Sequence, residues 1–80
     1  MNIKTGVIKA LSDNGHGYIK QDDGSVNLYF HAKDITNGNF DYLKVGEKVQ
    51  YIEREGARGY IAKSIVITRR QGKYRKITYI

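Results

Sequence analysis

NGHGYIKQDDGSVNLYFHA, residues 14–32, contains two short runs rich in β-branched and aromatic residues, and the sequence QDDGS separates them. Two such runs on either side of an Asp-Gly pair predict a β-hairpin, because glycine supplies the positive φ that a tight turn needs. We therefore expect strands at 16–21 and 26–32. The aromatic side chains of these strands could lie either in the core or on the solvent-exposed surface.

Alternation along a strand predicts which way its side chains point. In the first strand, Tyr18 shares a face with Lys20, and burying an unpaired lysine is costly, so this face is expected to contact solvent. In the second strand, Leu28 and Phe30 form an apolar row, and the opposite row begins with Asn27. Pairing the two strands then places four rings on one solvent-facing patch: His16, Tyr18, Tyr29 and His31.

Exposed rings in strands have an ordinary structural explanation. Tyrosine favours strands, and a cross-strand aromatic pair stabilises a sheet by about 0.2–1 kcal/mol. Four rings together are better explained as a binding surface. Unpaired bases stack on such rings with about 1–3 kcal/mol per base, and Lys9 and Lys20 could neutralise the phosphates. The histidines can stack or donate a hydrogen bond.

The rest of the chain also indicates an all-β fold. It has no proline and no long helical period, and further strand patterns occur at 2–11, 48–54 and 60–67. Between the third and fourth strands, 33–47 reads as a loop with a helical turn at 33–36. Five strands in this order predict a small five-stranded antiparallel Greek-key barrel, the OB-fold, whose second and third strands bind oligonucleotides. Closing the barrel would also remove exposed sheet edges.

Charge divides the chain into two parts. The net charge is +6, and five of the fourteen Lys and Arg residues but none of the eight acidic residues lie in 68–80, so 1–67 carries only +1. We expect a domain at 1–67 and a basic tail at 68–80. A cationic arm beside a nearly neutral body is common in nucleic-acid binders, and the alternative is a solvated tail that keeps the protein soluble. Its alternating pattern leaves an arm, an added strand or a dimer contact open.

Composition limits the protein class. Eighty residues make one small domain, and the absence of cysteine excludes disulfides and thiolate zinc sites. There is no apolar run of membrane-spanning length and no signal-peptide pattern at the N-terminus. We expect a cytoplasmic protein, monomeric, without membrane contact.

Several motifs in order resemble those of the cold-shock domain over residues 5–67. The family's first ribonucleoprotein motif, Lys-Gly-Phe-Gly-Phe-Ile, is similar to residues 14–19, and its second, Val-Phe-Val-His-Phe, to residues 28–32. Residues 38–40 resemble its glycine-phenylalanine loop, and 43–49 its Leu-x-x-Gly-x-x-Val. The turn at 56–59, followed by Ala62, resembles its Gly-x-x-Gly-x-x-Ala.

The resemblance implies a five-stranded oligonucleotide-binding barrel that binds single-stranded RNA or DNA, often as an RNA chaperone or a regulator of transcription or translation. It implies stacking roles for five residues: His16, Tyr18, Tyr29, His31 and Phe40. It also implies that Lys9 and Arg58 are basic contacts.

The chain departs from the family pattern at several positions. The Trp-Phe pair on the first strand is replaced by Ala10 and Leu11, the motif lysine by Asn14, and two motif phenylalanines by His16 and Ala32. Losing these rings and this charge predicts weaker binding. We therefore expect affinity that depends more on the basic tail and falls steeply with salt.

Some of these residues could also suggest a function other than nucleic-acid binding. His16 and His31 beside Asp13 or Asp34 could suggest a metal site or a nuclease, but the spacing is not that of metal ligands and no nucleophile motif is present. We expect no catalytic residue, cofactor, metal or small-molecule substrate. A tyrosine-rich patch could also bind a peptide, so a small protein-interaction module remains an alternative. Another is an OB-fold factor of the ribosomal or translation type.

Overall fold

The computed structural model describes residues 2–57 and 59–69. Arg58 and the part of the basic tail from residue 70 onward lie outside the described residues. Within the described residues, five strands and two short 3₁₀ helices follow one another: β1 (Ile3–Leu11), β2 (His16–Gln21), β3 (Leu28–His31), η1 (Ala32–Asp34), η2 (Phe40–Tyr42), β4 (Lys48–Gly56) and β5 (Gly59–Arg69). No helix in the described part of the chain is long and apolar enough to cross a membrane.

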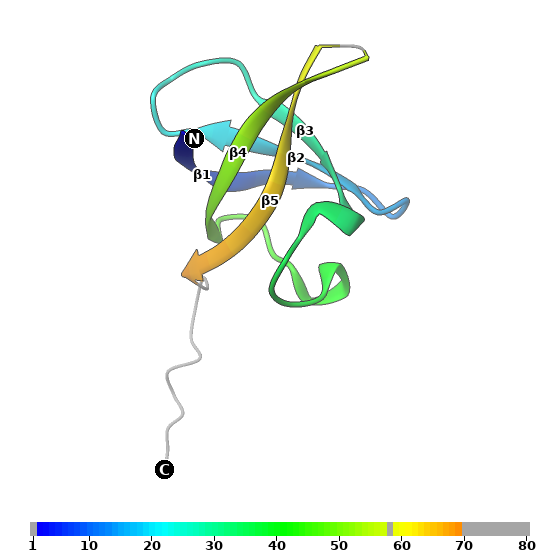
Figure 1. Cartoon of the computed structure of the whole chain (residues 1–80). Coiled ribbons are helices and arrows are strands. Elements are labelled where there is room, and N and C mark those ends of the chain that lie inside the picture. Colours follow the sequence, from blue (N-terminus) through cyan, green and yellow to red (C-terminus); the bar gives the residue numbers. More distant parts are fainter. Residues whose placement is uncertain (1, 58, 70–80) are drawn as a thin grey trace.

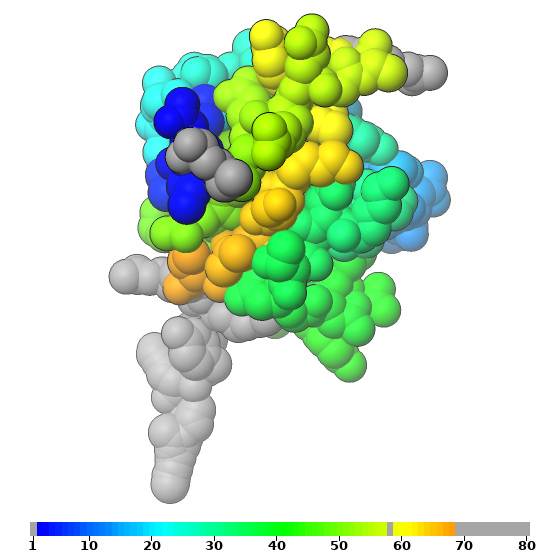
Figure 2. All heavy atoms as spheres, viewed as in Figure 1, coloured from blue at the N-terminus to red at the C-terminus, as the bar shows by residue number. Residues whose placement is uncertain are grey.

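The strands close into a barrel in the order β1-β2-β3-β5-β4 (Figure 1). This confirms the predicted five-stranded barrel. Four of the strand pairs are antiparallel, as expected. The pair that closes the barrel, β3 with β5, is parallel and joins Tyr29 to Ile61. Figure 2 shows β5 as a diagonal band beside β4 on one face of the molecule.

The predicted strand bounds hold with local differences. β2 has the expected limits, whereas β3 begins at Leu28 instead of Val26, which is 77% exposed. The side-chain Nε2 of Gln21 donates to the Val26 carbonyl at 2.7 Å, so a side chain and not a neighbouring strand binds this segment. β4 ends at Gly56 instead of Arg54, and β5 begins at Gly59 instead of Tyr60, because the hairpin that they form continues past the barrel. The predicted helical turn begins one residue early, at Ala32.

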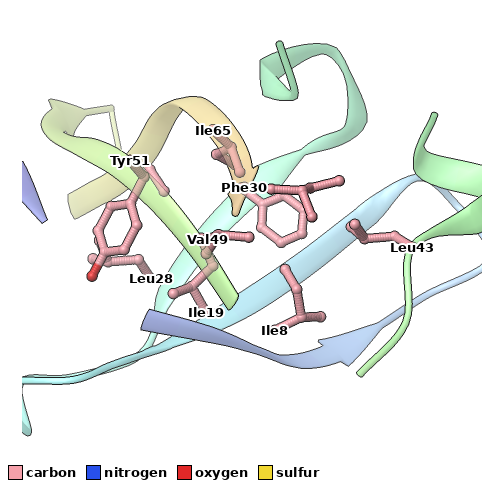
Figure 3. Close-up of a cluster of buried hydrophobic side chains, with 10 residues drawn as sticks. Ile8, Ile19, Leu28, Phe30, Leu43, Val49, Tyr51 and Ile65 are labelled. Carbon is pink, nitrogen blue, oxygen red and sulfur yellow. The ribbon is translucent and has the colours of Figure 1, made fainter. Parts of the chain in front are cut away.

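The core fills the barrel with apolar side chains from all five strands (Figure 3). Ile19, Leu28 and Phe30 are fully buried, as alternation predicted. The buried Gln21 is satisfied, because its Oε1 accepts from the Tyr51 hydroxyl at 2.8 Å. Within the described residues, no buried side-chain nitrogen or oxygen atom lacks a hydrogen-bond partner.

Glycine at two positions sets the geometry of the β2–β3 hairpin. Gly24 has a φ of +84°, which confirms the Asp-Gly turn predicted between the two strands. Gly17 pairs with Phe30 across the hairpin, and a Cβ atom there would come within 2.5 Å of Phe30 Cζ. The missing side chain at Gly17 lets the Phe30 ring come close to the β2 backbone. The residues on either side of Gly17, His16 and Tyr18, point the other way.

Candidate nucleic-acid interface

The register of β2 and β3 brings the four predicted rings together. His16 pairs with His31 and Tyr18 pairs with Tyr29, so the four side chains stand side by side on the outer face of the hairpin. We call these four residues the ring patch. Tyr18 is 46% exposed and Tyr29 36% exposed, and both histidines are half-buried. The rings are displayed, as the alternation argument predicted.

The rings form a connected series. The Tyr18 and Tyr29 ring centroids are 5.8 Å apart at an interplanar angle of 70°. The His16 ring stacks on Tyr29 at 5.3 Å and meets His31 edge-on at 5.1 Å. These distances are typical of stabilising aromatic pairs. The rings therefore hold one another in place on the outer face of the hairpin.

Hydrogen bonds fix two of the rings further. The Tyr29 hydroxyl is hydrogen-bonded to His16 Nδ1. His31 Nδ1 accepts from the Lys33 backbone N–H at 3.0 Å and so caps η1. Asp34 accepts from the His31 backbone N–H at 3.4 Å and from Lys63 Nζ at 3.1 Å. The position of His31 thus depends on the helical turn behind it.

The cap also determines what His31 can do. Because Nδ1 accepts a hydrogen bond, the neutral ring carries its proton on Nε2. The ring can therefore donate to a base or phosphate oxygen, but it offers no Nε2 lone pair to a metal ion while the cap is formed. Across residues 2–57 and 59–69, no group of three or more His, Cys, Asp or Glu residues could hold a metal ion.

Lys9 and Lys20 lie on the strands that lead to the ring patch. Both are exposed, Lys20 on β2 and Lys9 at a β-bulge in β1 between Ile8 and Ala10. Neither forms an ion pair within the described part of the chain, unlike Lys4 and Lys63. Their charges are therefore available to a polyanion.

Phe40 is placed apart from the ring patch. It is half-buried, and its ring packs edge-on against Phe30 at 6.4 Å, next to the core. It lines a separate hollow of about 620 Å³ with, among others, Leu11, Asp13 and Asp41. The two carboxylates make this hollow unfavourable for phosphates. Arg58, the last predicted contact, lies outside the described residues.

The sequence reasoning missed a second hollow, which adjoins the ring patch. It has a volume of about 630 Å³ and is lined by residues of β2, β3, the segment just before β3 and the β4–β5 hairpin: Tyr18, Asn27, Tyr29, Gly56, Ala57, Tyr60 and Ile61. The parallel pairing of β3 with β5 creates it. No local sequence pattern predicts that pairing, because the two strands are far apart in the chain. We call it the β3–β5 hollow.

A charged cluster beside the β2–β3 turn has a structural role. Lys4 Nζ lies 2.9 Å from Glu53 Oε1 and 3.3 Å from Asp23 Oδ2, which ties β1, β4 and the turn together. The hydrogen bonds that Asp23 accepts from Ser25, together with nearby Lys4, lower the pKa of the Asp23 carboxyl to about 2. This cluster fixes the turn between the two strands that carry the rings.

Comparison with known proteins agrees with this geometry. The sequence model of the family described as 'Cold-shock' DNA-binding domain matches residues 4–68. The chain is 37% identical over 68 residues to Cold shock-like protein CspB of Escherichia coli (strain K12), which covers 84% of this chain and 96% of the relative. It is 33% identical over 66 residues to Cold shock-like protein CspG of Shewanella violacea, with 81% and 94% covered.

A solved structure supports the fold alone. The solved structure of drosophila Unr CSD456 superimposes on this chain with a TM-score of 0.72 at 14% identity. The match covers 96% of this chain and 29% of that one.

Proposed function

The chain belongs to the cold-shock domain family, whose members bind nucleic acid and are not enzymes, and on that premise we propose that it binds single-stranded RNA or DNA on the ring patch. The observation that carries the proposal is the pair formed by Tyr18 and Tyr29. Both rings are exposed, they are partners across β2 and β3, and their centroids are 5.8 Å apart. Two fixed neighbouring rings suit the stacking of successive unpaired bases.

The roles we assign follow from the contacts of each residue. Tyr18 and Tyr29 stack bases. His16 orients Tyr29 through the hydrogen bond between them, and its own ring is part of the ring patch. His31 donates from Nε2 to a base or phosphate oxygen. Lys9 and Lys20 neutralise phosphates on the approach to the patch.

Phe40 and Arg58 have assignments that rest more on the family resemblance. Phe40 would stack a base only in its own hollow, beyond the ring patch, where Asp13 and Asp41 keep phosphates away. Arg58 would contact a phosphate near the β4–β5 hairpin.

Binding that relies mainly on stacking suits the cellular role that we propose. Every base has a π-face, so a ring shelf binds many sequences with modest affinity. Such binding fits an RNA chaperone or a regulator of transcription or translation, since it keeps strands unpaired without holding them permanently. We infer a cytoplasmic monomer with its domain at 1–67 and a basic tail at 68–80 that adds phosphate contacts.

The test is a titration with a fluorescently labelled, pyrimidine-rich single strand. Tyr18→Ala and Tyr29→Ala should each weaken binding by about 1–3 kcal/mol, the contribution of one stacked base. Tyr42→Ala is the matched control, because Tyr42 is 69% exposed on η2 and is not part of the ring patch. If the wild type does not bind the strand, or if all three variants bind it as tightly as the wild type, the ring patch is not a nucleic-acid surface.

A further inference from the structure

His16 and His31 face each other across β2 and β3 and form one end of the ring patch. They are partners in the register of the hairpin, and their ring centroids lie 5.1 Å apart in an edge-on arrangement. Both side chains are half-buried, so a bound strand can reach them. Histidine is the side chain whose charge changes most readily between about pH 5 and 8. The surface that we assign to nucleic acid therefore contains two groups that can take up a proton.

The two imidazoles differ in the partner of Nδ1. His16 Nδ1 is hydrogen-bonded to the Tyr29 hydroxyl, a group that can either donate or accept. His31 Nδ1 accepts from the Lys33 backbone N–H at 3.0 Å, and a backbone N–H can only donate. A proton added to His16 therefore only reverses its hydrogen bond, because Nδ1–H then donates to the Tyr29 oxygen. A proton added to His31 would remove the acceptor that caps η1.

Reversal of the bond between His16 and Tyr29 keeps the ring patch intact. Tyr29 retains its partner, so its ring retains its orientation for stacking. Within residues 2–57 and 59–69, no group is hydrogen-bonded to His16 Nε2, and protonation makes this N–H a charged donor. The hydroxyl hydrogen of Tyr29 is released from Nδ1 and becomes available as a second donor. Both donors suit a phosphate oxygen of the bound strand.

The charges around His16 favour uptake of the proton together with a strand. The ion pairs of the described residues involve Lys4 and Lys63 but neither histidine. Asp34 is already bound by Lys63 and by the His31 N–H. Besides the rings of the patch, the charged side chains on the elements next to His16 are Lys9 of β1, Asp13 of the turn before β2, Lys20 of β2, and Lys33 and Asp34 of η1. The three lysines oppose a further positive charge in the free protein, whereas phosphates of a bound strand would offset it.

We propose that His16 takes up one proton from solvent when the ring patch binds a single strand, so that its imidazolium contacts a backbone phosphate and affinity rises with acidity. Linkage gives the sign, because a ligand that favours the protonated form binds more tightly at lower pH. One exposed charge pair strengthens binding by about two- to fivefold. His16 stands where the family motif has phenylalanine, so the effect belongs to this chain. The inference rests on the proposed function, because it requires a strand on the ring patch.

The experiment measures the affinity for a labelled oligothymidine at about pH 5.5, 6.5 and 7.5 and at constant ionic strength. Neither thymine nor the phosphodiester group titrates in this interval, so any change comes from the protein. The wild type should bind about two- to fivefold more tightly at the lowest pH than at the highest. The slope of log affinity against log salt should also steepen by about 0.7, for one more phosphate contact. Equal affinity at all three pH values refutes only this inference, whereas no binding at any of them refutes the proposed function itself.

Substitution separates the two histidines. His16→Phe keeps an aromatic ring on β2 but cannot gain a proton, so its affinity should be the same at all three pH values. His31→Asn is the matched control, because asparagine is a good N-cap residue and its side-chain oxygen can replace Nδ1 at η1. This variant should bind more weakly than the wild type but keep the pH dependence. The proposal is overturned if the pH dependence survives in His16→Phe or disappears in His31→Asn.

Nuclear magnetic resonance of the wild type follows the same proton without a substitution. The imidazole ring protons of His16 report its protonation, and the midpoint of their titration should move to higher pH when oligothymidine is added. The midpoint for His31 should move less, because its Nδ1 remains bound to the Lys33 N–H. A His16 midpoint that stays in place or moves to lower pH on strand binding would contradict the proposal.

Discussion

Gly17 lies directly against the Phe30 ring, and a Cβ atom at this position would be 2.5 Å from Phe30 Cζ and 2.9 Å from the Ala10 carbonyl oxygen. The contact joins the inner and outer faces of the β2–β3 hairpin. Because Phe30 fits under the backbone at Gly17, the flanking His16 and Tyr18 are held on the outer face. The packing of Phe30 in the core and the position of the ring patch therefore depend on the same contact.

The Gly17→Ala variant tests this contact. The added methyl group has no room, so Phe30 or the β2 backbone must shift, and overpacking of this kind costs about 1–3 kcal/mol. The free energy of unfolding, measured by urea denaturation, should fall by that amount. Gln50→Ala, at an exposed position of β4, should change it by less than about 0.5 kcal/mol. Equal stability of Gly17→Ala and wild type would show that the close approach is not required.

Tyr51→Phe tests the buried hydrogen bond that secures the loop before β3. The variant keeps the ring but removes the hydroxyl that donates to Gln21 Oε1 at 2.8 Å. Leaving that buried oxygen without a donor should cost about 1–3 kcal/mol. Thermal unfolding of Tyr51→Phe and of the double variant with Gln21→Leu should show that the two losses are not additive. Additive losses would mean that the two groups do not act together.

The acid dependence of stability follows from Asp23. Its hydrogen bonds with Ser25 and its contact with Lys4 lower the pKa from 3.8 to about 2, so the folded state favours the carboxylate. Asp23 therefore stabilises the fold fully above pH 3.8, and this contribution is lost as the pH falls toward about 2. Denaturation midpoints measured across this interval should decline less steeply for Asp23→Asn than for the wild type. Identical slopes would exclude Asp23 as a source of acid sensitivity.

Salt dependence tests the roles of the unpaired lysines. If Lys20 neutralises one phosphate, Lys20→Gln should reduce the slope of log affinity against log salt by about 0.7, the value for a single-stranded ligand. Lys48→Gln, on β4 and separated from β2 by β1, is the matched control and should leave the slope unchanged. A wild-type affinity that does not change between about 50 and 200 mM salt would contradict the proposed reliance on charge.

The parts of the structure that local pattern determines could be predicted from the sequence. Alternation placed Ile19 and Phe30 inside and Tyr18 and Tyr29 outside, because the period of a strand is short and a misplaced lysine is costly. The parallel pairing of Tyr29 with Ile61 could not be predicted, since it depends on how the whole barrel closes. The β3–β5 hollow was missed for the same reason.

Phe40 shows a second limit. Its motif predicted a stacking residue, but motif spacing does not show how deeply a side chain lies, and the ring packs next to the core against Phe30. The hydrogen bond from the Lys33 N–H to His31 could not be predicted either. It depends on the turn at Ala32–Asp34, which begins one residue before its expected position.

Nuclear magnetic resonance of the wild type can observe whether Tyr18 and Tyr29 stack unpaired bases, as we propose. On addition of a pyrimidine-rich single strand, the ring protons of Tyr18 and Tyr29 should shift upfield together, because a stacked base lies over each ring. The same sequence as a perfect duplex should cause much smaller shifts. Strand binding that shifts neither tyrosine ring, with shifts confined to other surfaces, would show that these two tyrosines do not stack bases.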